Sequence, residues 1–107
     1  MFREEIEQEL GKYFESSDSI QGLVLEASPD FKNKKGGENF EAMMSRIIAL
    51  LGSVLSLPSG RVLAILSDTA DRELIAHQLE RSVKVKTLVM FIADEPSEIL
   101  EYIGPYL

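Results

Sequence analysis

The middle of the chain contains a long stretch that is almost free of charge. Between Glu41 and Arg61 the only charged residue is Arg46. On a helical wheel of about 100° per residue, the large apolar side chains of 39–57 fill roughly half of the circumference. The other half carries mainly small residues, namely Ala42, Ser45, Ala49, Gly52, Ser53 and Ser56. This pattern predicts a helix over 39–57 whose small face packs closely against another helix, which we expect to come from a second subunit.

Length and charge limit the classes of protein to consider. A chain of 107 residues forms one domain, residues 1–107, with a single core. The formal net charge of -7 opposes binding to nucleic acid and to anionic membranes. The apolar stretch 42–57 is too short to span a bilayer and contains Arg46. We therefore expect no nucleic-acid partner and no direct membrane insertion.

The chain has no cysteine, which excludes disulfides, thiolate metal sites and a cysteine nucleophile. Its first residues are acidic and amphipathic, whereas a secretory signal needs a basic start followed by an apolar run. Both features favour a cytoplasmic location.

Hydrophobic periodicity and turn formers predict the remaining elements. Apolar residues at steps of three and four predict a helix over 2–15, and Pro96 begins a short amphipathic helix with Ile99, Leu100 and Ile103. Asn39 is the expected N-cap of the long helix, which Pro58 ends. Continuous apolar runs predict three strands, at 20–27, 61–67 and 86–93. The lysine- and glycine-rich segment 31–38 is a loop or at most a short edge strand near Phe31.

The segment 72–81 decides the topology and admits two interpretations. As a helix, for which its residues have good propensity, it leads to a small three-stranded, parallel α/β/α domain. As a strand, it is the middle of an antiparallel meander of 61–67, 72–80 and 86–93, where polar residues are tolerated on a solvated face.

Taken in order, these elements resemble the roadblock family of dynein light chains and bacterial gliding regulators. The resemblance rests on the leading helix, on Ser19-Ile20-Gln21-Gly22-Leu23-Val24-Leu25-Glu26-Ala27, on the long apolar helix, and on the runs 59–66, 73–79 and 87–93. The family pattern is helix, two strands, helix, three strands, helix, and it covers nearly the whole chain. The chain departs from the family after its first strand, where lysines and glycines replace the usual Asp-Gly hairpin and second strand.

The resemblance implies an α/β (α+β) fold with a central, mainly antiparallel sheet, one long helix and terminal helices. It also implies a non-enzymatic homodimer that regulates or scaffolds a small GTPase or a larger complex. The dimer contact is then expected on the small face of 39–57, at Ala42, Ser45, Ala49, Gly52, Ser53 and Ser56. Under the parallel alternative, the chain is instead a ligand- or nucleotide-binding domain with its site at the strand C-termini, near Ser28, Ser67, Asp68 and Asp94.

No candidate for catalysis or metal binding has its required partners in sequence. His77 is the single histidine and has no identifiable nucleophile or further ligand by spacing. Asp68 and Asp71 lack the remaining positions of a calcium loop and are better explained as turn and capping residues. The lysines at 32, 34 and 35 lack a Walker signature and are typical of a solvated loop. We therefore expect no catalytic residue, no cofactor and no metal ion.

Overall fold

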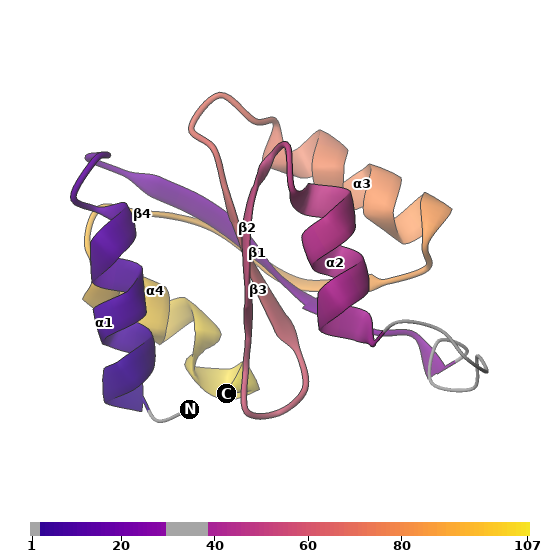
Figure 1. The fold of residues 1–107 in the computed structure, drawn as a ribbon, viewed down its shortest axis with the longest axis horizontal. Helices are drawn as coiled ribbons and strands as arrows, with labels where there is room; N and C mark the ends of the chain where they lie inside the picture. The colour runs from indigo at the N-terminus through magenta and orange to yellow at the C-terminus, as the bar shows by residue number, and fades with distance from the viewer. Residues whose placement is uncertain (1–2, 30–38) are drawn as a thin grey trace.

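The computed structural model describes residues 3–29 and 39–107. These residues form four α-helices, four strands and a final 3-10 turn (Figure 1). In chain order they are α1 (Arg3–Tyr13), β1 (Ile20–Glu26), α2 (Phe40–Ile48), β2 (Gly52–Ser56), β3 (Val62–Leu66), α3 (Arg72–Ser82), β4 (Lys86–Ala93), α4 (Pro96–Ile103) and η2 (Gly104–Tyr106).

The four strands form one antiparallel sheet in the order β2-β3-β1-β4. Strand β1 therefore lies between β3 and β4, and the register places Leu23 opposite both Ala64 and Met90. The pairing of β1 with β4 contains a bulge, since Val24 is opposite Val89 whereas Leu25 is opposite Thr87. Among the strands of residues 3–29 and 39–107, β2 and β4 are the two edge strands.

Helices cover both faces of the sheet, two on each side (Figure 1). Strand β1 alternates between two cores because successive side chains of a strand point to opposite faces. Ile20 and Val24 belong to the core under α1 and α4, while Leu23 and Leu25 belong to the core under α2 and α3. Because both faces are covered, the central strands are apolar at nearly every position.

The helix predicted over 39–57 is shorter than expected and is followed by a strand. Helix α2 begins after Asn39, whose side chain accepts a hydrogen bond from the amide of Ala42 (2.8 Å), as predicted for an N-cap. It ends at Ile48, and the amide of Leu51 then donates to the carbonyl of Ile48 (2.7 Å). The chain turns back on itself there and continues as β2.

Two features of β2 explain why its residues resembled a helix in sequence. Val54 packs with the core under α2 and α3 and Leu55 with the core under α1 and α4, so neither face of the strand requires charge. Gly52 is needed because an added Cβ would overlap the carbonyl oxygen of Ile65 on the neighbouring strand β3. An uncharged strand after an amphipathic helix thus looks like a continuation of that helix.

Segment 72–81 is a helix, and both topologies predicted for the chain require correction. Asp71 caps α3 by accepting a hydrogen bond from the amide of Leu74 (3.1 Å). The predicted meander is wrong, since its middle strand is α3 and β1 separates β3 from β4. The parallel α/β/α alternative is wrong because every strand pair is antiparallel.

The coarse expectation of an α+β fold around an antiparallel sheet is confirmed. The described element order differs from the roadblock pattern at α3, where that pattern has a strand. The possible second strand near Phe31 and the lysines at 32, 34 and 35 lie outside the described residues.

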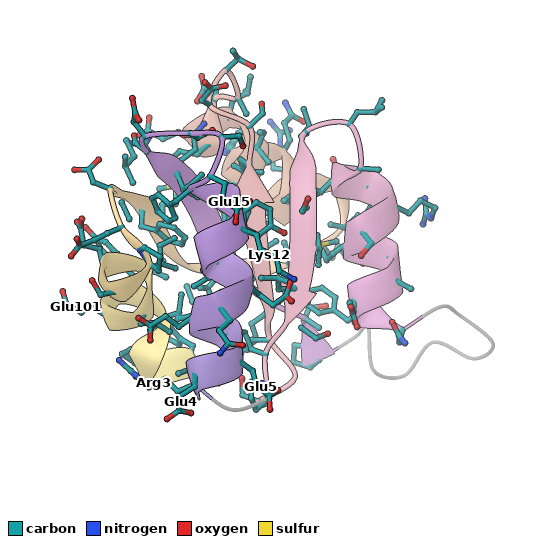
Figure 2. The ribbon with its side chains drawn as sticks, turned by 60° about the vertical axis from the view of Figure 1, so that its left-hand side comes forward. Arg3, Glu4, Glu5, Lys12, Glu15 and Glu101 are labelled. Carbon is teal, nitrogen blue, oxygen red and sulfur yellow. The ribbon has the colours of Figure 1, made fainter. Side chains whose placement is uncertain are left out.

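The outward surface of the terminal helices is acidic (Figure 2). Glu4, Glu5 and Glu15 are exposed on and just after α1, and Glu101 is exposed on α4. The Lys12 ammonium donates to the Glu9 carboxylate (2.8 Å), which raises the pKa of Lys12. An exposed pair of this kind adds little to stability. This face repels polyanions, in agreement with the net charge.

Gly22 is required by close packing at the centre of the sheet. A Cβ at this position would lie 2.5 Å from the Ala64 carbonyl oxygen and 2.7 Å from Cζ of Phe91, whose ring stacks on Tyr102. We expect Gly22→Ala to lower the free energy of unfolding by about 1–3 kcal/mol through overpacking.

The matched control is Gly11→Ala in helix α1, where an added Cβ meets nothing within 4 Å. This substitution should raise the free energy of unfolding by about 0.5–1 kcal/mol, since alanine restricts the unfolded chain and favours helix. Urea unfolding followed by circular dichroism measures both variants. Equal effects of the two substitutions would contradict this account of Gly22.

Candidate functional site

The six residues predicted for the dimer contact lie on two elements instead of one helix face. Ala42, Ser45 and Ala49 are exposed on α2 or at its C-cap, whereas Gly52, Ser53 and Ser56 belong to the edge strand β2. Helix α2 packs over β2, but Ser53 alternates with Val54 and therefore faces the other side of the sheet, where it lines a pocket with Tyr13. Between them, Leu50 is 98% exposed and Leu51 is 37% exposed. We call these residues of α2, of β2 and of the turn between them the β2 edge surface: Ala42, Ser45, Ala49, Leu50, Leu51, Gly52, Ser53 and Ser56.

The four residues of the alternative ligand site are not brought together. Ser67, Asp68 and Asp94 follow β3 and β4, whose C-termini lie at one end of the sheet. Ser28 follows β1, which runs in the opposite direction and ends at the other end. Ser67 and Asp68 line a pocket of about 220 Å³ together with Tyr13 and Ser53. The expectation of a common crevice at the strand C-termini fails because the sheet is antiparallel.

His77 and Asp71 also have definite places. His77 is exposed on α3, and Asp71 caps the same helix through its hydrogen bond to Leu74. Within residues 3–29 and 39–107, no group of three or more histidine, cysteine or acidic residues is arranged to hold a metal ion.

Gln21 is a buried polar residue that the sequence analysis did not single out. Its Nε2 donates to the carbonyl oxygens of Ser67 and Ala70, both at 2.7 Å, and its Oε1 accepts from Nη1 of Arg72 at 3.1 Å. The side chain thereby fixes the loop between β3 and α3 to the central strand. The available signal was a single amide within the otherwise apolar run of β1.

The edge strand β4 carries an exposed apolar surface on both of its faces. On the face covered by α3, Met90 is 41% exposed and Ile92 is 48% exposed. On the opposite face, Tyr102 of α4 is 42% exposed and stacks on Phe91, with ring centroids 5.5 Å apart. We call Met90, Ile92 and Tyr102 the β4 edge patch. No described strand pairs with the outer edge of β4, so its outward backbone groups are available to another chain.

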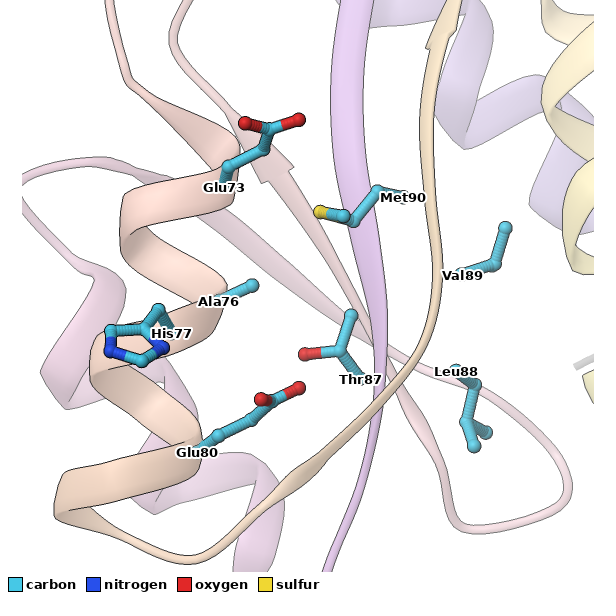
Figure 3. Close-up of a pocket in the computed structure, with 8 residues that line it drawn as sticks. All are labelled: Glu73, Ala76, His77, Glu80, Thr87, Leu88, Val89 and Met90. Atoms are coloured by element: carbon cyan, nitrogen blue, oxygen red, sulfur yellow. The ribbon is translucent and has the colours of Figure 1, made fainter.

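A groove of about 480 Å³ separates α3 from β4 (Figure 3). Glu73, His77 and Glu80 form its α3 side, since spacings of four and three residues place them on one flank of the helix. Thr87 and Met90 lie on the β4 side, and the buried Oγ1 of Thr87 has no hydrogen-bond partner among the described residues. The groove thus combines acidic groups from the helix with a polar and an apolar side chain from the open strand.

The sequence predicted the strand 86–93 but not its position at the edge of the sheet. A continuous apolar run is typical of a strand that is buried on both faces. Which strand lies at an edge depends on long-range pairing, which the local sequence does not encode.

Comparison with protein-family models, with curated proteins and with solved structures finds no match to this chain. Among the described residues, no helix has both the length and the apolar character that crossing a membrane requires.

The role assigned to Gln21 predicts a large effect of its removal. Gln21→Leu removes the amide group that donates to the Ser67 and Ala70 carbonyls and accepts from Arg72, all three part-buried hydrogen bonds. The Ser67 carbonyl keeps only its bond from the Ala70 amide (3.1 Å). We expect the free energy of unfolding to fall by about 2–4 kcal/mol, with faster hydrogen exchange in the loop 67–71.

Gln78→Leu on the exposed side of α3 is the control, with an expected change within about 0.5 kcal/mol. Chemical denaturation and amide hydrogen exchange measure both variants. If exchange in the loop stays at the wild-type rate in Gln21→Leu, the side chain does not anchor it.

Proposed function

We propose that this protein is a non-enzymatic interaction module that forms a homodimer and engages a further protein partner. The observation that supports the proposal is the distribution of exposed apolar side chains. Leu50 and Leu51 adjoin the open edge β2, and Met90, Ile92 and Tyr102 surround the open edge β4. Exposed apolar groups beside unpaired strand edges favour association with other polypeptides.

The kind of partner is the one that the resemblance in the sequence implied, although α3 stands where that family has a strand. A small GTPase or a subunit of a larger complex can add a strand or a helix to such an edge, because backbone hydrogen bonds supply affinity and side-chain pockets supply specificity. The proposal assigns no catalytic residue and no cofactor. The absence of cysteine fits a reducing compartment, and we place the protein in the cytoplasm.

Self-association is the part of this proposal that can be tested with the protein alone. Sedimentation velocity at about 50 µM should show a dimer, since this concentration exceeds the roughly micromolar Kd of a modest interface. The dimer should dissociate progressively on dilution. A species with the mass of one chain over the whole concentration range would contradict the homodimer.

A further inference from the structure

We propose that the self-contact is made by β4, which pairs antiparallel with β4 of a second copy about a two-fold axis near Phe91. This inference rests on the proposed homodimer and names its surface. It moves the contact from the predicted β2 edge surface to the opposite edge of the sheet.

The bulge determines which part of β4 can pair regularly. Leu88 is the extra residue in the pairing with β1, so regular alternation extends from Val89 to Ala93. Phe91 is the middle residue of this stretch. Antiparallel pairing centred there places Met90 opposite Ile92 of the second copy, and Ile92 opposite its Met90.

This register buries the β4 edge patch on both faces of the extended sheet. Met90 and Ile92 share the face covered by α3, because they lie opposite Leu23 and Gln21 of β1. Two copies therefore bring four exposed apolar side chains into one cross-strand cluster. Tyr102 lies over the same centre on the other face, where it stacks on Phe91.

The charges at the two ends of β4 select the antiparallel direction. Lys84 and Lys86 stand at its beginning, and Asp94 and Glu95 follow its end. Antiparallel pairing places the basic end of each strand beside the acidic end of the other. Parallel pairing would place like charges side by side, which is unfavourable. This complementarity is a reason to choose a second copy over an unrelated strand.

Strand β2 is less suited to self-pairing. Three of its five residues, Gly52, Ser53 and Ser56, contribute little apolar area, whereas the regular stretch of β4 over 89–93 is apolar at every position. Leu50, its most exposed apolar neighbour, lies in the turn before the strand.

Pairing of β4 also brings the two α3 helices together. Helix α3 packs over both β4 and β1, so its axis lies between these two strands. With strands about 4.8 Å apart, the two α3 axes would be about 10 Å apart across the pair, the distance of packed helices. The flank that carries Glu73, His77 and Glu80 then faces its own copy. Mutual repulsion of these carboxylates opposes the apolar contact, so their removal should tighten the dimer.

Charge substitutions on β4 test the surface. Met90→Lys combined with Ile92→Lys should raise the dimer Kd at least tenfold in sedimentation, with an unchanged circular dichroism spectrum, because both side chains are exposed. Ala49→Glu on the β2 edge surface is the matched control and should leave the dimer intact. Dissociation by Ala49→Glu alone would overturn the β4 assignment while leaving the homodimer in place. A monomeric wild type would overturn both.

Glu73→Gln combined with Glu80→Gln tests the approach of the helices. This pair of substitutions should lower the dimer Kd roughly threefold, since it removes exposed like charges. An unchanged or higher Kd would overturn the arrangement about Phe91.

Cysteine cross-linking tests the register, because the natural chain has no cysteine. Residues directly opposite in an antiparallel pair have Cα atoms about 4.5–5.5 Å apart, within the range of a disulfide. A mixture of Met90→Cys and Ile92→Cys proteins should form disulfide dimers faster than either variant alone. Ser53→Cys should form none. Rapid cross-linking of Ser53→Cys, or no difference between the mixture and the single variants, would overturn the proposal even if the lysine variant fails to fold.

Discussion

The fold depends on strand β1, which is paired along both edges and buried on both faces. It belongs to two cores at once, so each helix layer is positioned against the same seven residues. Two of these residues have a definite packing or hydrogen-bonding role. Gly22 leaves room for the Phe91 ring and the Ala64 carbonyl, and Gln21 holds the loop that leads into α3. The position of α3 over β4, and hence the groove between them, follows from these contacts with β1.

Local signals in the sequence were sufficient for elements that have their own start and stop residues. The strand at 86–93, the helix beginning at Pro96 and the N-cap at Asn39 were predicted because turn formers and periodicity mark them. The strand β2 was missed because Val54 and Leu55 pack partly against the two cores on its opposite faces, so the strand lacks the polar alternation that distinguishes a strand from a helix. Segment 72–81 stayed open because its residues have good helix propensity but also fit a partly solvated antiparallel strand. Strand order could not be predicted, since pairing of β1 with β3 and β4 joins residues far apart in the chain.

The candidate surfaces also include residues that the sequence predicted and residues that it did not. The small residues of 42–56 were predicted on one helix face, but a turn at Leu50 divides them between α2 and β2. The β4 edge patch was missed because Met90 and Ile92 look like core residues in sequence. Their exposure results from the absence of a fifth strand beyond β4 among the described residues.

The two edge strands differ in the features that natural proteins use to prevent unwanted pairing at a sheet edge. A short strand with serines and little apolar area, such as β2, is a poor template for pairing. Strand β4 has eight residues and no charge between Thr87 and Ala93, so its bulge is the main device that limits pairing. A two-fold contact at β4 closes on itself, because the same patch is used by both copies. If both edges self-paired, alternating two-fold contacts would extend the sheet without limit. If instead β4 pairs with a second copy and the β2 edge surface binds a different protein, the result is a closed dimer. Its two identical partner sites then lie at the outer ends of the extended sheet.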